Sequence, residues 1–156
     1  MPVCNNQFRW HQNCTINGNF IPMSTSKIEH INPDELIKNP AFTNVITVSN
    51  ATKTIYIGEQ NSNNAKGEIV GKGDLKVQTI QVLKNIETAL KAAGAGFDNV
   101  IKWTIILLEG QSLQEGFAAF QQVWGKRPNP PVITALFVAS LANPDYLLGI
   151  EAVAVL

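Results

Sequence analysis

Residues 100–124, with the sequence VIKWTIILLEGQSLQEGFAAFQQVW, decide the fold more clearly than any other stretch. The segment from Val100 to Leu108 is apolar at nearly every position, a pattern typical of a strand covered on both faces. Ser112 and Glu115 then form the sequence of a helix capping box. The apolar residues that follow recur at helical spacing: Leu113, Phe117, Phe120 and Trp124. The stretch therefore predicts a buried strand followed by a helix with one core-facing side.

A second helix is predicted upstream of this stretch. Asp74 is a suitable N-cap, and Gly94 and Gly96 would end the helix. The apolar residues between these limits also follow the helical period: Leu75, Val82, Leu83, Ile86, Leu90 and Ala93. Residues 61–73 are polar and rich in glycine, and we interpret them as a loop.

Four further apolar runs predict strands. Residues 45–48 and 54–57 are separated by a short turn, which predicts a hairpin. Residues 132–139 and 147–155 follow the second helix and are joined by a turn at 142–145. The order β-β-α-β-α-β-β predicts an α+β fold, with one mixed sheet and two helices packed on one face.

Charge in this chain is low and balanced. The 156 residues suffice for one domain with a full core, and 12 Lys and Arg balance 12 Asp and Glu. Such a balance gives no positive patch for nucleic acid or for a membrane surface, so neither is expected as a partner. Charged residues make up 15% of the chain, against about 25% in ordinary soluble domains. A surface with so little charge is readily buried against copies of itself, which favours a homo-oligomer.

The first thirty residues differ from the remainder. They are crowded with Asn, Gln, Thr and Pro, so we expect an irregular extension over residues 1–30 and a folded domain over residues 31–156. Cys4, His11 and Cys14 invite a zinc interpretation, but their spacing matches no standard zinc finger. Ordinary thiols are favoured, and neither a metal nor another cofactor is expected.

The expected location is the cytoplasm. No apolar run reaches the ~18 residues of a membrane span, and the first residues do not have the pattern of a signal peptide. Residues 1–23 contain one basic residue, Arg9, and no acid, which is a weak likeness to a transit peptide.

Common catalytic motifs do not occur in the sequence, and a carboxylate in an apolar strand is the most unusual group. Glu151 interrupts residues 149–155, where an ionised side chain needs a partner or water. Either it lies on the solvated face of an edge strand, or it lines a cleft between subunits. Glu59 interrupts an earlier strand in the same way, and an exposed strand end is the simpler interpretation there.

Several segments, in the right order, resemble the Rid (reactive intermediate deaminase) family, also called L-PSP endoribonuclease-like proteins. Residues 56–60, YIGEQ, resemble its YxSGQ strand, and residues 149–155, GIEAVAV, resemble its EIEAIAV strand. Further similar segments are the G-x-(I/L)-V loop at 67–71, the QT…VLxNI helix at 78–86, the AAG segment at 92–95, the VVKTT strand at 100–104 and the GPYSQ-like turn at 39–44. The resemblance spans residues 38–156.

This resemblance implies a chorismate-mutase-like fold assembled as a homotrimer, with three small-molecule clefts at the subunit interfaces. In deaminating members an Arg in a PxR motif grips the substrate carboxylate, and a Glu of the last strand positions water against an enamine or imine carbon. A guanidinium binds a carboxylate through two hydrogen bonds, and a carboxylate can orient or deprotonate water. The resemblance gives this second role to Glu151.

The sequence departs from the family at several of these positions. Ile133 stands at the Arg position of PxR, and Gly58 and Glu59 replace the Ser and Gly of YxSGQ. Losing the Arg and gaining Glu59 lowers the charge of each expected site by two, which opposes anionic substrates. Arg127, on the preceding loop, would partly compensate. The candidate ligand-binding residues are Phe42, Gly58, Glu59, Arg127, Ile133 and Thr134, with Glu151 as the catalytic candidate.

Three functions are left open by the sequence. The first is a homotrimer that has diverged from imine deamination, as a binding protein or as an enzyme of altered chemistry, and takes a neutral or cationic, partly apolar ligand. The second is a working enamine or imine deaminase in which Glu151 positions water and Arg127 or backbone groups replace the clamp. The third, a ribonuclease, is disfavoured by the neutral charge and by the lack of a histidine pair or a basic cluster.

Overall fold

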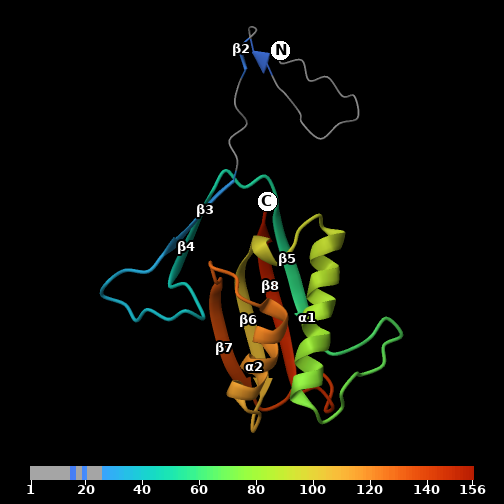
Figure 1. The fold of residues 1–156 in the computed structure, drawn as a ribbon. Coiled ribbons are helices and arrows are strands. Elements are labelled where there is room, and N and C mark those ends of the chain that lie inside the picture. Colours follow the sequence, from blue (N-terminus) through green and yellow to red (C-terminus); the bar gives the residue numbers. More distant parts are fainter. Residues whose placement is uncertain (1–14, 17–18, 21–25) are drawn as a thin grey trace.

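The computed structural model describes residues 15–16, 19–20 and 26–156 (Figure 1). Cys4, His11 and Cys14, considered above as zinc ligands, lie outside the described residues. The elements in chain order are β1 (Thr15–Ile16), β2 (Asn19–Phe20), β3 (Lys27–Ile31), β4 (Val45–Ser49), β5 (Thr54–Gln60), α1 (Leu75–Ala92), the 3-10 helix η1 (Phe97–Asn99), β6 (Val100–Leu108), α2 (Leu113–Trp124), β7 (Val132–Val138) and β8 (Leu148–Val155).

The main sheet has four strands in the order β5-β8-β6-β7. β8 is antiparallel to both of its neighbours, whereas β6 and β7 run parallel. Both helices cover the same face of this sheet (Figure 1). The prediction of an α+β fold with a mixed sheet and two helices on one face is therefore confirmed.

The predicted hairpin between residues 45–48 and 54–57 is wrong. β4 pairs with β3 in a separate two-stranded sheet, and β5 pairs with β8. β5 carries the buried Ile55 and Ile57, whose sheet partners on β8 are Ala154 and Ala152. β4 is exposed at alternate residues and has no such core face, so it pairs with a strand of the same character.

Both helices begin, and α1 also ends, where their sequences predict. The carboxylate of Asp74 accepts a hydrogen bond from the Val77 amide at 2.9 Å, and Gly94, with φ of 81°, follows the end of α1. The Ser112 hydroxyl accepts from the Glu115 amide at 3.2 Å at the start of α2. Leu113 alone departs from the predicted core stripe of α2, because it lies in the first turn and is half exposed.

An aromatic cluster centred on Trp103 joins β6 to α2. The Trp103 ring is fully buried, and its centroid lies 5.7 Å from that of Phe120 and 5.8 Å from that of Trp124, both in edge-to-face contact. Phe97 of η1 completes the cluster at 6.1 Å. Such pairs add to the free energy of area burial, so the cluster fixes β6 against the helices.

The opposite face of the sheet is not covered by the described residues. On β6, Trp103 and Leu107 are buried under the helices, whereas Thr104 and Ile106, which point the other way, are half buried and Lys102 is exposed. The prediction that residues 100–108 are covered on both faces is therefore wrong for the single chain. We call this uncovered side the open face.

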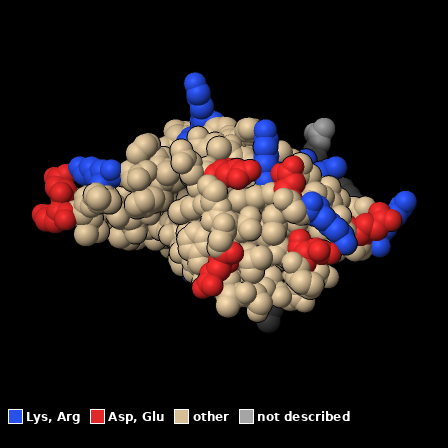
Figure 2. Space-filling model, turned by 90° about the horizontal axis from the view of Figure 1, so that it is seen from below, with Lys and Arg blue, Asp and Glu red and all other residues tan. Residues whose placement is uncertain are grey.

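Charged side chains do not gather by sign on the side of the molecule that Figure 2 shows. Basic and acidic groups are interspersed there and separated by wide uncharged areas. Among the described residues, no helix combines the length and the apolar character needed to cross a bilayer.

Candidate functional site

The open face is organised in rows that run across the strands. Glu151 of β8 pairs with Thr104 of β6, which pairs with Thr134 of β7, so these three side chains form one polar row. The next row toward the start of β6 contains Tyr56, Val153, Lys102 and Val132, and the row on the other side contains Gly149, Ile106 and Leu136. β8 lies inside the sheet, so the alternative that Glu151 belongs to an edge strand is wrong.

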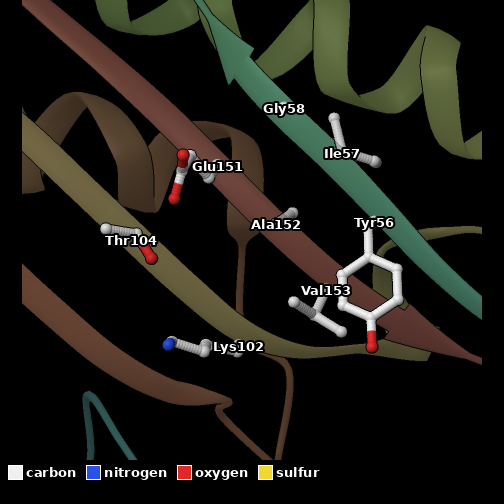
Figure 3. Close-up of a pocket in the computed structure, with 8 residues that line it drawn as sticks. All are labelled: Tyr56, Ile57, Gly58, Lys102, Thr104, Glu151, Ala152 and Val153. Carbon is white, nitrogen blue, oxygen red and sulfur yellow. The ribbon is translucent and has the colours of Figure 1, made fainter.

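A shallow pocket of about 220 Å³ lies over β5, β8 and β6 on this face. Figure 3 shows Glu151 beside Thr104, with Lys102 and Tyr56 on either side of Val153. The lining residues are Tyr56, Ile57, Gly58, Lys102, Thr104, Glu151, Ala152 and Val153. The pocket thus combines a carboxylate, an ammonium, a hydroxyl and apolar side chains.

The carboxylate of Glu151 is available to a ligand. Its residue is half buried, and within the described part of the chain it has no salt bridge and no side-chain hydrogen bond. Lys102 is likewise without an ion-pair partner among the described residues. A half-buried carboxylate without a partner accepts hydrogen bonds from a ligand more strongly than a solvated one.

Gly58 and Glu59 lie where β5 leaves its regular register. Ile57 pairs with Ala152, but Gln60 pairs with Ile150, so the two residues between form a bulge. Gly58 lines the pocket of Glu151, and the Glu59 side chain lies beside Gly149. Asn61 donates a hydrogen bond to the Glu59 carboxylate at 2.9 Å. Gly58 is thus part of the pocket of Glu151, whereas Glu59 lies outside its lining, beside Gly149, and also borders a groove between β5 and α1.

Ile133 is not on the open face. It pairs in register with Trp103, whose side chain points toward the helices, and it packs against the hydrophobic core. Its neighbour Thr134 points the other way and is exposed. Phe42 is half buried in a turn away from this pocket, next to Thr43, whose hydroxyl donates to the Pro130 carbonyl at 2.6 Å.

Arg127 lies just beyond the C-terminal end of α2, where several contacts hold its guanidinium. Its guanidinium pairs with Asp98 at 2.8 Å, donates to the Trp124 carbonyl, and lies over the rings of Phe97 and Trp124 at 5.3 and 4.9 Å from their centroids. These contacts tie η1 to α2 and leave Arg127 out of the group that surrounds Glu151.

Sequence reasoning missed the pocket's other three polar residues: Tyr56, Lys102 and Thr104. All three occur in segments that resemble the family, but their position beside Glu151 depends on the pairing of β5, β8 and β6. No local pattern in the sequence gives that register. The described residues contain no group of three His, Cys, Asp or Glu side chains arranged to hold a metal ion.

Comparison with known proteins agrees with this fold. A family model described as Endoribonuclease L-PSP matches residues 37–156. These residues hold the whole main sheet and both helices, which defines the class of protein. The chain belongs to this family, the one called Rid above.

Individual relatives give the same result. A RutC family protein of Pyrococcus horikoshii is 40% identical over 88 residues, which are 56% of this chain and 67% of the relative. A human 2-iminobutanoate/2-iminopropanoate deaminase is 34% identical over 104 residues, 66% of this chain and 73% of the relative. Among solved structures, a Rid-family protein of unknown function from Yersinia pestis has a TM-score of 0.74 at 29% identity, covering 83% of this chain and 98% of that one. The first of these matches spans about two thirds of the relative's own length.

Proposed function

We propose that this protein is a homotrimer that binds a small molecule in clefts between subunits, each cleft built on the open face of the sheet. Its ligand is neutral or cationic and partly apolar. The observation that carries the proposal is that the open face presents the unpartnered Glu151, whereas Ile133, at the position of the family's Arg, packs into the core on the other side. An extension over residues 1–30 and a domain over residues 31–156 that forms the cleft remain part of the proposal, although β3 (Lys27–Ile31) gives the end of this extension regular structure.

Charge and shape on the open face support this class of ligand. Lys102 and Glu151 line the pocket together, and the Glu59 carboxylate lies beside Gly149 of the same strand as Glu151. An ammonium or amide donor would bond to Glu151, and an apolar group would pack on Tyr56 and Val153. The carboxylate of a 2-imino acid would meet no guanidinium there and would be desolvated without a bidentate partner.

The alternative function is imine deamination. The human relative named a 2-iminobutanoate/2-iminopropanoate deaminase favours it, together with the Glu151 carboxylate beside the Thr104 hydroxyl. These two groups would position water, while Lys102 would attract the substrate carboxylate as a point charge.

A single assay separates the two functions. A 2-imino acid is generated from L-leucine by an amino-acid oxidase, and its hydrolysis is followed as the loss of trapping by semicarbazide. We expect the wild-type protein to give the rate obtained with serum albumin. Acceleration that Glu151→Gln abolishes would establish the deaminase instead. In parallel, an unstructured RNA should stay intact, since Lys102 offers one cation where a nuclease needs a cluster.

Binding is measured with three probes of equal size: L-alaninamide, which is cationic, lactamide, which is neutral, and lactate, which is anionic. Titration followed by nuclear magnetic resonance should give tighter binding of alaninamide or lactamide than of lactate. Tightest binding of lactate would overturn the proposed ligand class.

A further inference from the structure

Residue 149 is a glycine for a steric reason. It lies on the open face, opposite Ile106 of β6 and one residue beyond Ile150, whose partner on β5 is Gln60. A Cβ atom at residue 149 would lie 2.6 Å from both Cγ and Cδ of Glu59 and closer still to Oε1. The carboxylate of Glu59 thus fills the space that a side chain at residue 149 would occupy.

The bulge and one amide hold Glu59 in this place. Because the register shifts between Ile57 and Gln60, Glu59 is not a regular ladder residue, and its side chain can turn across β8. The Asn61 amide donates to Glu59 Oε1 at 2.9 Å and lies 3.4 Å from the Leu148 carbonyl, which anchors the carboxylate to the start of β8.

The residue types at positions 59 and 149 are exchanged relative to the family segments quoted above. YxSGQ has Gly where this chain has Glu59, and EIEAIAV has Glu where this chain has Gly149. The carboxylate therefore belongs to the neighbouring strand in this chain, and it lies where the first side-chain carbon of residue 149 would be. The expected loss of two charges per site is therefore wrong: the exchange of Glu and Gly is neutral, and residue 133 packs against the core, so Ile133 changes no charge on the open face.

We infer that Glu59, reaching across Gly149, is a specificity-determining residue of the cleft and selects ligands that carry an ammonium group. This inference rests on the proposed function. Gly149 and Glu151 are two residues apart on β8, so their side-chain positions on the open face are separated by about 7 Å. An ammonium group bound between the two carboxylates would form charge-assisted hydrogen bonds with both, and an anion would be repelled by both.

The first test needs no ligand. Thermal unfolding is compared for the wild type, Gly149→Glu, Glu59→Gly and the double exchange. Gly149→Glu should lower the unfolding midpoint by roughly 4 °C or more, because a second carboxylate is forced into occupied space. Adding Glu59→Gly should recover most of that loss. A double variant as unstable as the two single effects combined would overturn the inference.

The second test uses the probes. Glu59→Gln should weaken the binding of L-alaninamide by roughly tenfold and leave lactamide within a factor of two. The exchanged double variant should keep the preference for alaninamide, since its carboxylate returns to residue 149. Glu87→Gln, which removes an acid from α1, is the charge-matched control.

The outcomes of the two proposals are distinct. If the wild type prefers alaninamide and Glu59→Gln keeps that preference in full, the inference is wrong and the proposed function stands. If the wild type prefers lactate, the proposed ligand class fails and the selective role of Glu59 fails with it, whatever the thermal result.

Discussion

The face of the sheet on which a side chain lies determines which substitutions the position tolerates, and Ile133 is the clearest case. The sequence VITALFV of β7 is apolar on both faces, so its periodicity does not tell which residues face the helices. The register with Trp103 settles that Ile133 belongs to the core side and Thr134 to the open face.

Ile133→Arg should therefore fail to create an imine deaminase. The guanidinium would be placed against the core, and we expect the free energy of unfolding to fall by about 1–3 kcal/mol, measured by urea denaturation. Thr134→Arg, one residue along and exposed, is the matched control and should cost less. Imine hydrolysis by a fully stable Ile133→Arg protein would show that β7 is shifted by one residue relative to β6.

Glu151 allows a second test at the same scale. Because its carboxylate has no partner among the described residues, Glu151→Gln should leave the unfolding midpoint nearly unchanged. The affinity for L-alaninamide should drop by roughly tenfold, since a charge-assisted bond is replaced by a neutral one. Unchanged affinities for all three probes would mean that Glu151 has only a structural role.

Among the elements, the helices could be predicted from sequence and the strand partners could not. Asp74, Ser112 and Gly94 act on backbone groups a few residues away, so the local sequence contains the whole signal. A strand run such as Thr54–Gln60 shows only that a strand forms. Its partner, β8, is distant in sequence, because α1, β6, α2 and β7 lie between the two strands in the chain. The bulge that places Glu59 over Gly149 depends on both strands.

The Asp74 cap gives a prediction for α1. Asp74→Ala removes the acceptor for the Val77 amide and should lower the free energy of unfolding by about 1 kcal/mol. Asp34→Ala serves as the control, because the Asp34 side chain is 91% exposed and its ion pair with Lys38 lies at the surface. A loss at Asp34 equal to that at Asp74 would show that general charge removal, and not the cap, is responsible.

For the whole molecule, the open face predicts assembly. Ile106, Leu136 and Val153 share this face with the polar row, and the described residues leave it uncovered. A sheet face of this kind is typical of an obligate interface. Light scattering should give a mass three times the 17.0 kDa of the single chain, and a well-behaved species of 17.0 kDa would contradict the trimer.

Two equally exposed residues test which surface is used. Leu136 on the open face is 37% exposed, and Ile80 on α1 is 36% exposed. Leu136→Asp should weaken the trimer, whereas Ile80→Asp should leave its mass unchanged. Dissociation caused by Ile80→Asp and not by Leu136→Asp would place the interface on the helical side.

The position of β8 also governs when the protein can fold during its synthesis. β8 is the latest strand in this sequence, yet it lies between β5 and β6. Until residues 148–155 have left the ribosome, β5 has no partner in the main sheet, and the apolar sides of α1 and β6 have only part of their core. The nascent chain therefore exposes apolar surface until β8 is available. We expect a ribosome-associated chaperone to bind a chain of this kind.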